Sequence, residues 1–161
     1  MILHTFMKNT FLLLMVIGAF TSCNKDDDNI TINEQNFLIF GHFYGFCGGE
    51  ECIETYKLTD VKLYEDIVDD YSGQNLDFVE LDNEQFELVN DLPDFFPTQL
   101  LNESDAVFGC PDCADGGGLF IQYSDNGVLK SWRIDQVQNN VPSYLHDFID
   151  KVNEDIALLN N

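Results

Sequence analysis

The segment LFIQYSDNGVLKSWRID, residues 119–135, decides the fold of this chain. Its centre, Asn126-Gly127, is the preferred pair of a two-residue β-hairpin turn, and the flanking runs are rich in β-branched and aromatic residues. That turn sets three cross-strand pairs on one face: Leu119 with Ile134, Ile121 with Trp132, and Tyr123 with Lys130. The opposite face carries Gln122, Ser124, Ser131 and Arg133. The segment therefore predicts an antiparallel hairpin with one face in the core and the other in solvent.

The residues upstream predict more of the same sheet. Residues 37–46 are apolar at both alternating sets of positions, which is typical of a central strand covered on two sides. Residues 52–58 and 61–66 predict a hairpin about Thr59-Asp60. A two-residue turn there places Tyr56, Leu58, Val61 and Leu63 on one face and Lys57 and Lys62 on the other. A shorter strand is expected over residues 76–81.

Two helices are predicted beside the strands. Asp82 is a candidate N-cap for a helix over residues 83–92, with Gln85 at the capping-box position. Pro142 or Ser143 opens a C-terminal helix, whose apolar residues recur at helical spacing: Leu145, Phe148, Ile149, Val152, Ile156 and Leu159. The sequence thus predicts a single α+β domain over residues 36–161. We expect a mostly antiparallel sheet of about five or six strands built from hairpins, with the long C-terminal helix packed on one face.

Residues 1–22 have the three parts of a secretory signal peptide. Lys8 supplies the positive charge, residues 11–20 form an apolar segment, and Thr21-Ser22 are small residues before Cys23. The apolar segment has ten residues, whereas a membrane-spanning helix needs about 20. We therefore expect a signal peptide that is removed, followed by a flexible acidic tether over residues 23–35.

Two motifs identify a resemblance. Phe20-Thr21-Ser22-Cys23 resembles a bacterial lipobox, and the residues that follow, Asn24 to Asn29, are similar to the Cys-x-Lys-Asp-Asp start of many Bacteroidetes lipoproteins. Residues 36–159 resemble a domain of uncharacterised Bacteroidetes lipoproteins, in the two cysteine pairs, the Asp-Gly-Gly-Gly corner, the Trp-Arg-Ile-Asp strand end and the Pro-led helix. The resemblance implies a membrane anchor through lipidated Cys23, with palmitate among its acyl chains. It also implies an outer-membrane lipoprotein that faces the cell surface, with a periplasm-facing anchor as the alternative, and it transfers no activity.

The charge of the chain excludes one large class of partners. The formal net charge is -22, and it becomes -23 once residues 1–22 are removed, because Lys8 is the only charged residue among them. Such a surface repels nucleic acid and anionic membranes. Hydrophobic residues make up 45% of the chain, so we expect the acidic residues to lie on the surface of a folded domain rather than in a disordered tail. We expect a protein or another cationic ligand as the partner.

Beyond Cys23, four cysteines remain: Cys47, Cys52, Cys110 and Cys113. In an exported chain an even set predicts two disulfides, and the spacing favours the two local pairs over cross-pairs that would join the halves of the domain. The same residues are alternative ligands of a tetrahedral zinc site. The two-residue gap between Cys110 and Cys113 is also the spacing of a thiol-redox pair.

The glycines 116–118 need a structural reason, because three in a row allow unusual backbone angles or a close approach. A tight structural corner is one interpretation. The other is a cation site formed by Asp112, Asp115 and backbone carbonyls, with Glu50 or Glu51.

Motifs for catalysis are missing from the sequence. It contains no nucleophile elbow, phosphate loop, dinucleotide fingerprint or His-Glu-x-x-His motif. Beyond the signal peptide only two histidines remain. We expect His42 to be hydrogen-bonded within a strand and His146 to be solvated. The sequence predicts a non-enzymatic binding or interaction module without a cofactor. A zinc or calcium module and a small thiol-redox enzyme are the alternatives.

Overall fold

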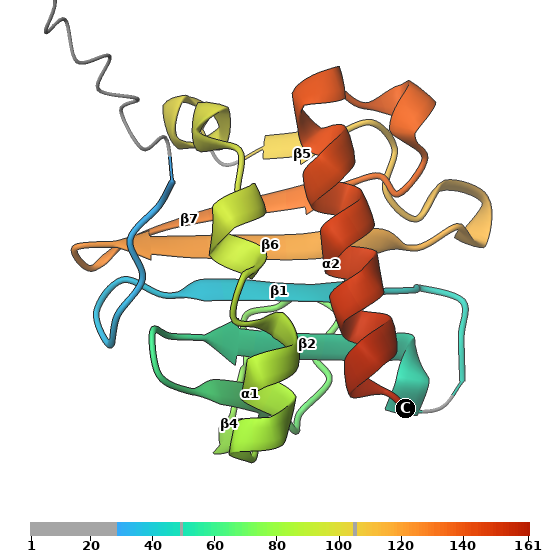
Figure 1. The fold of residues 1–161 in the computed structure, drawn as a ribbon. Helices are drawn as coiled ribbons and strands as arrows, with labels where there is room; N and C mark the ends of the chain where they lie inside the picture. The colour runs from blue at the N-terminus through green and yellow to red at the C-terminus, as the bar shows by residue number, and fades with distance from the viewer. Residues whose placement is uncertain (1–28, 49, 105) are drawn as a thin grey trace, which may run out of the picture.

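The computed structural model describes residues 29–48, 50–104 and 106–161 (Figure 1). The predicted signal peptide, Cys23 and the first part of the tether lie outside these residues. The described chain forms one seven-stranded sheet in the order β4-β3-β2-β1-β6-β7-β5. The strands are β1 (Leu38–Phe43), β2 (Ile53–Leu58), β3 (Leu63–Asp66), β4 (Phe78–Glu80), β5 (Ala106–Phe108), β6 (Gly118–Asp125) and β7 (Val128–Ile134). The helices are α1 (Asn83–Val89) and α2 (His146–Leu159), and the short 3-10 turns are η1 (Glu50–Cys52), η2 (Leu92–Phe95), η3 (Thr98–Asn102), η4 (Cys113–Asp115), η5 (Gln138–Asn140) and η6 (Ser143–Leu145).

The predicted α+β architecture is confirmed, and so is its central hairpin. Strands β6 and β7 pair in the expected register, Leu119 with Ile134, Ile121 with Trp132, and Tyr123 with Lys130. Asn126 and Gly127 both have positive φ, of 50° and 82°, as the primed turns of two-residue hairpins require. Strand β1 lies between β2 and β6 and is the central strand that its apolar pattern predicts.

The register predicted for the β2–β3 hairpin is wrong by two residues. Leu58 pairs with Leu63, so the loop runs over residues 59–62 and Val61 is exposed. The reason is local: the Thr59 hydroxyl oxygen accepts from the Lys62 N–H at 3.1 Å, and the Thr59 N–H donates to the Lys62 carbonyl at 2.9 Å. These bonds close a wider turn, which a sequence without glycine there favours.

One strand more than expected completes the sheet. Strand β5 pairs in parallel with β7 and forms one edge. Its three residues are too few to show an alternating pattern, and it exists only because β7 offers a free edge to pair with.

One face of the sheet is covered by both helices, which lie side by side across the strands (Figure 1). The Asp82 side chain accepts from the Gln85 N–H at 2.9 Å, as its predicted role as N-cap requires. Helix α1 ends at Val89, three residues short of the prediction. Every residue of the apolar stripe on the C-terminal helix is buried or partly buried in the core. Phe96 joins this core, against the rings of Tyr123, Trp132 and Phe148.

The opposite face is not the solvated face that the hairpin pattern predicts. Gln122 and Ser124 are buried, and a second small core contains Ile39, Phe43 and Phe120, with Phe37, Ile53, Leu76 and Phe78 packed around it. The connection over residues 67–77 folds back over this face and brings Gly73 against the Phe120 ring. A non-local cover of this kind leaves no periodic signal in the strand that it buries. No helix among the described residues has the length and apolar character to cross a membrane.

Candidate functional site

Both disulfides lie at one end of the sheet. Cys47–Cys52 closes the connection from β1 to β2, and Cys110–Cys113 lies just before β6, with Cα atoms 5.6 and 5.5 Å apart. The strands meet there because Phe43, the last residue of β1, pairs with both Ile53 and Gly118. The structure thus has the two local pairings that the spacing favours.

Asp112 connects the two bridged segments. Its Oδ2 accepts from the Gly45 N–H and from the Tyr71 hydroxyl, both at 3.0 Å, and its Oδ1 accepts from the Gly117 N–H at 3.2 Å. The hydrogen bond from Gly45 is the main reason that the pKa of Asp112 lies below its usual value. A Cβ atom on Gly45 would lie 2.3 Å from the same carboxylate. Only glycine fits there, because the backbone approaches the carboxylate so closely.

The three glycines 116–118, which lead into β6, are explained by a structural corner. Gly117 has a φ of +69°, and a Cβ atom there would lie 2.2 Å from the Tyr44 ring. The corner contains three further residues with positive φ, Asp112, Ala114 and Asp115. The Cys110–Cys113 bridge and the Asp112 hydrogen bonds hold this unusual backbone in place.

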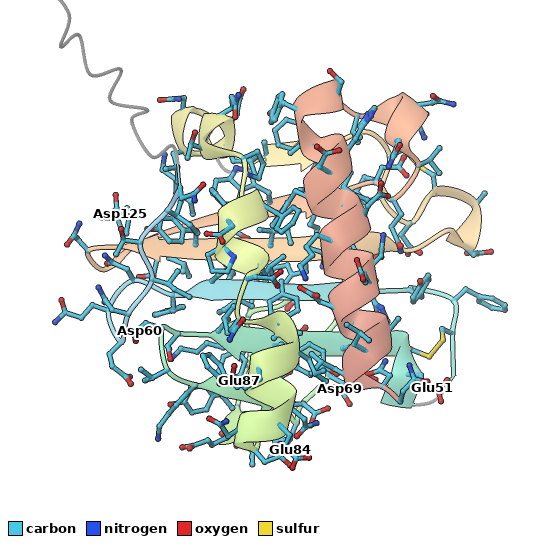
Figure 2. All side chains as sticks on the ribbon, viewed as in Figure 1. Glu51, Asp60, Asp69, Glu84, Glu87 and Asp125 are labelled. Atoms are coloured by element: carbon cyan, nitrogen blue, oxygen red, sulfur yellow. A yellow bond between two sulfur atoms is a disulfide. The ribbon has the colours of Figure 1, made fainter. Side chains whose placement is uncertain are left out.

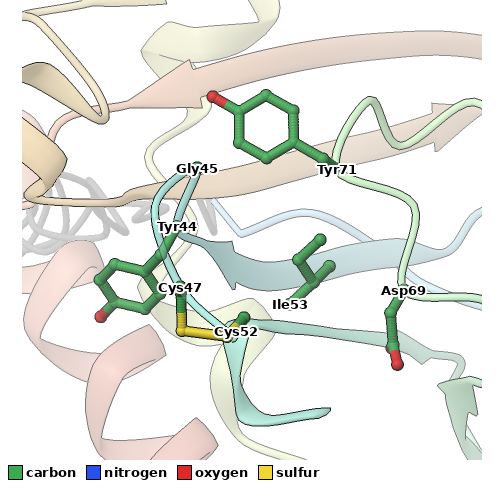
Figure 3. Close-up of a pocket in the computed structure, with 7 residues that line it drawn as sticks. All are labelled: Tyr44, Gly45, Cys47, Cys52, Ile53, Asp69 and Tyr71. Atoms are coloured by element: carbon green, nitrogen blue, oxygen red, sulfur yellow. A yellow bond between two sulfur atoms is a disulfide. The ribbon is translucent and has the colours of Figure 1, made fainter. Parts of the chain in front are cut away.

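A hollow of about 530 Å³ opens beside this corner. We call it the tyrosine hollow; its lining residues are Tyr44, Gly45, Cys47, Cys52, Ile53, Asp69 and Tyr71. Figure 3 shows Ile53 between the Cys47–Cys52 disulfide and Asp69, with Tyr71 above them. The Tyr71 ring, the Ile53 side chain and the disulfide make an apolar wall, and Asp69 supplies a carboxylate, whereas the Tyr44 ring lies on the far side of the disulfide.

The aromatic wall is held rigidly. The Arg133 guanidinium stacks on the rings of Phe43 and Tyr71, 4.2 and 4.8 Å from their centroids, and donates to the Tyr71 carbonyl. The Tyr44 hydroxyl accepts from the Gln136 side chain at 3.3 Å. Because the Arg133 contacts fix the Tyr71 ring, this wall of the hollow exists before any ligand arrives.

A second hollow, of about 290 Å³, shares Asp69 with the first. We call it the acidic hollow; its lining residues are Glu54, Glu65, Asp66, Ile67 and Asp69. Burial raises the pKa of Glu54 and of Glu65, and the Asp69 carboxylate raises both further. Asp66 is buried, and its two oxygens accept from the N–H groups of Asp69 and Asp77. A positive charge near Glu54 and Glu65 would therefore favour their ionised forms.

The predicted cation site is not assembled as a cluster. Asp112 accepts three hydrogen bonds from protein groups, Asp115 and Glu51 are exposed, and the side chain of Glu50 lies outside what the structure describes. Within the described ranges no group of three or more His, Cys, Asp and Glu residues is placed to hold a metal ion. The four sulfur atoms of the alternative zinc site are paired in the two disulfides. Cation binding at the corner stays a prediction.

Both described histidines contact backbone carbonyls. His42 Nε2 lies 3.2 Å from the Glu51 oxygen, and burial lowers the pKa of the ring. His146, predicted to be solvated, is half-buried, with Nε2 2.9 Å from the Gln138 oxygen. The turn η5, which precedes α2 and carries that carbonyl, explains the difference.

Comparison of the sequence with protein-family models and with curated proteins finds no match.

The most prominent residues of the two hollows, Tyr44, Tyr71, Asp69 and Glu65, have no signal in the sequence. Tyr71 and Asp69 belong to an acidic connection that the composition marks only as a surface loop. Their place beside the Cys47–Cys52 bridge follows from the fold of that connection over the second core. The nearest signal is the even set of cysteines, which predicts a disulfide-bonded region but does not identify the residues that pack beside it.

Proposed function

We propose that this chain is a lipid-anchored protein of the outer membrane, displayed on the cell surface, whose domain is a non-enzymatic binding module. The signal peptide, the lipobox-like segment and the acidic start after Cys23 support the anchor and its orientation. The two disulfides agree with an oxidising location outside the cytoplasm.

One observation carries the proposal: the tether and the tyrosine hollow lie at opposite ends of the sheet. The N-terminal segment reaches the domain near the β6–β7 turn, where the Asn126 N–H donates to Asn36 and the Ser124 hydroxyl donates to the Gln35 carbonyl. The hollow lies at the start of β6, eight residues away along the strand, or about 25 Å. Figure 1 shows the N-terminal segment and η1 at opposite sides of the sheet. A domain anchored at its N-terminus presents the hollow away from the membrane.

The anchor is tested in cells that produce the full chain. We expect alkyne-palmitate labelling of the parent chain and none of Cys23→Ala. External protease should remove the domain from intact cells carrying the parent chain. Labelling that persists in Cys23→Ala would contradict lipidation at this residue, and protection of the domain until the outer membrane is opened would contradict surface display.

The binding site is tested by amide NMR on ¹⁵N-labelled residues 24–161. The probe is a mixture of blocked dipeptides, Trp-Lys, Trp-Gln and Trp-Glu, each acetylated and amidated. We expect the largest shift changes at Tyr44, Ile53 and Tyr71. If the mixture leaves these three amides unchanged, the tyrosine hollow is not a binding site for peptides of this kind.

A further inference from the structure

We infer that the tyrosine hollow and the acidic hollow together bind a basic segment of a partner protein, in which a lysine or arginine stands beside an apolar residue. The inference rests on the proposed binding function and adds the chemistry of the ligand. Its geometric basis is Asp69, which lines both hollows, so that an apolar surface and an acidic one are continuous.

The tyrosine hollow provides the apolar half of the site. Ile53 and the ring of Tyr71 offer faces for an aromatic or aliphatic side chain, and Tyr71 is 40% exposed. Apolar surface continues outside the hollow at Phe46, 84% exposed, and at Ile67, 58% exposed. Phe46 stands between Gly45 and Cys47, which both line the hollow, so a large exposed apolar ring lies next to it in the chain. Exposed apolar surface of this kind marks interaction sites.

The acidic hollow provides the charged half. Burial raises the pKa of Glu54 and Glu65, the Glu65 and Asp69 carboxylates raise the pKa of Glu54 further, and Asp69 does the same to Glu65. The residues lining the two hollows include no lysine or arginine. An ammonium or guanidinium group that enters between these carboxylates gains several attractions at once and relieves their mutual repulsion.

The basic side chains of the described residues are already engaged, so none of them supplies the cation. They are held as follows: Lys57 over the Phe37 ring, Lys62 with Glu80, Lys130 with the Leu101 carbonyl, Arg133 with Tyr71, and Lys151 with Asp91 and Asp155. Arg133 contacts a residue of the hollow, since it stacks on Phe43 and on Tyr71. Charge complementarity therefore favours a basic partner.

A protein segment fits this surface better than a small amine. Two hollows of about 530 and 290 Å³ accept two neighbouring side chains, one apolar and one basic. The exposed Phe46, next to Cys47 of the tyrosine hollow, and the exposed Ile67 of the acidic hollow offer contact to residues that flank those two. A small amine would leave this outer surface uncovered.

The inference is tested with separate probes on the parent domain, residues 24–161, by following the Ile53 amide in NMR titrations. Blocked Trp-Lys should bind about fivefold more tightly than blocked Trp-Gln, and Trp-Glu more weakly still. Blocked Gly-Lys, which lacks the apolar side chain, should also bind more weakly than Trp-Lys. Raising NaCl from about 0.05 to 0.5 M should remove most of the preference for lysine.

Matched variants locate the charge. Asp69→Asn keeps a residue that tolerates the positive φ of 53° at this position, and Glu65→Gln keeps the shape of its side chain. The double variant should bind Trp-Lys about fivefold more weakly and bind Trp-Gln unchanged. Asp125→Asn is the control, because it removes one exposed charge at the opposite end of the sheet (Figure 2), and it should change neither affinity by more than about twofold.

The outcomes separate the inference from the proposed function. If the three Trp dipeptides bind equally at Ile53, the hollow is a binding site but the basic ligand is wrong. Binding of tryptamine that is tighter than binding of Trp-Lys would replace the protein segment by a small amine. If no probe shifts Ile53, both the site and the inference fail. Should the double variant not fold, the probe series and the salt titration on the parent domain still decide.

Discussion

The Asp112 carboxylate accepts a hydrogen bond of 3.0 Å from the Tyr71 hydroxyl, across 41 residues of sequence. The same oxygen accepts from the Gly45 N–H. Gly45 and Tyr71 both line the tyrosine hollow, whereas Asp112 belongs to the Cys110–Cys113 corner. One side chain thus connects the corner to two segments of the hollow, which makes Asp112 a positioning residue.

Asp112→Asn should loosen the hollow without unfolding the domain. The amide nitrogen cannot accept, so at least one of the three hydrogen bonds is lost in either orientation of the side chain. We expect faster hydrogen exchange at the amides of Gly45 or Gly117, and weaker binding of the Trp-Lys probe. In the parent domain the pKa of Asp112 lies below its usual value, so these hydrogen bonds persist into the acidic range and are lost when acid protonates the carboxylate. Unchanged exchange at both amides would contradict the positioning role.

Replacement of Phe95 and of Phe96 by alanine should lower the free energy of unfolding by very different amounts. Phe96 is 3% exposed and contacts three core rings, so Phe96→Ala should lower the free energy of unfolding by about 3–5 kcal/mol. Phe95 is 43% exposed, beside the Lys151 ammonium, and Phe95→Ala should cost less than about 1 kcal/mol. Urea unfolding of the two variants measures both values. Equal losses would show that the neighbouring phenylalanines share one environment.

The two disulfides are tested by intact mass on residues 24–161, with and without an alkylating reagent and with elemental metal analysis. We expect a mass four hydrogens below that of the reduced chain, no alkylation and no zinc. Peptide mapping should find Cys47 joined to Cys52 and Cys110 joined to Cys113. Because the loops are short, removing either pair should cost about 2 kcal/mol. Free thiols with one zinc per chain, or a peptide that joins Cys52 to Cys110, would contradict this arrangement.

Asp155 makes stability depend on pH in the direction opposite to most acids. It is fully buried in α2, with Lys151 Nζ 2.9 Å from one oxygen, and burial raises its pKa to about 6. Repulsion from Asp91 and Glu154 adds to the rise, and Lys151 opposes it. The folded state therefore holds this proton up to about pH 6, whereas the unfolded chain releases it near 3.8. Its stabilisation is complete below pH 4 and is lost as the pH rises through 6.

The comparison with Asp155→Asn isolates this group, since the other titrating groups are common to both chains. From pH 4 to pH 7 the free energy of unfolding of the parent should fall by about 2–3 kcal/mol relative to the variant. Urea unfolding at several pH values measures the difference. A difference that stays constant over this range would mean that Asp155 ionises as it does in the unfolded chain.

Local signals account for the parts of the fold that the sequence predicts. Asn126-Gly127 fixes the register of β6 and β7, and Asp82 marks the start of α1. The apolar stripe of α2 identifies the helix but not the buried Asp155 within it. The β2–β3 register depends on a Thr59 side-chain bond that competes with a tighter turn.

The candidate site depends on contacts that no local pattern contains. The four cysteines are visible in the sequence, and their local pairing follows from spacing. The connection over residues 67–77, however, contacts the sheet through Gly73 on Phe120 and Tyr71 on Phe43. These contacts bury the face that alternation assigns to solvent, and they bring Tyr71 and Asp69 beside the disulfide. Composition alone marks that connection only as acidic.

The most direct test of the central claim is the set of intermolecular NOEs between blocked Trp-Lys and ¹³C-labelled residues 24–161. We predict contacts from the probe indole to the Tyr71 ring and to the Ile53 methyl groups, with the lysine side chain near Glu65. A third hollow, at the tether end of the sheet, is lined by Phe37 and Leu129 and serves as the alternative site. Contacts to those two residues, with none to Ile53 or Tyr71, would contradict binding at the tyrosine hollow.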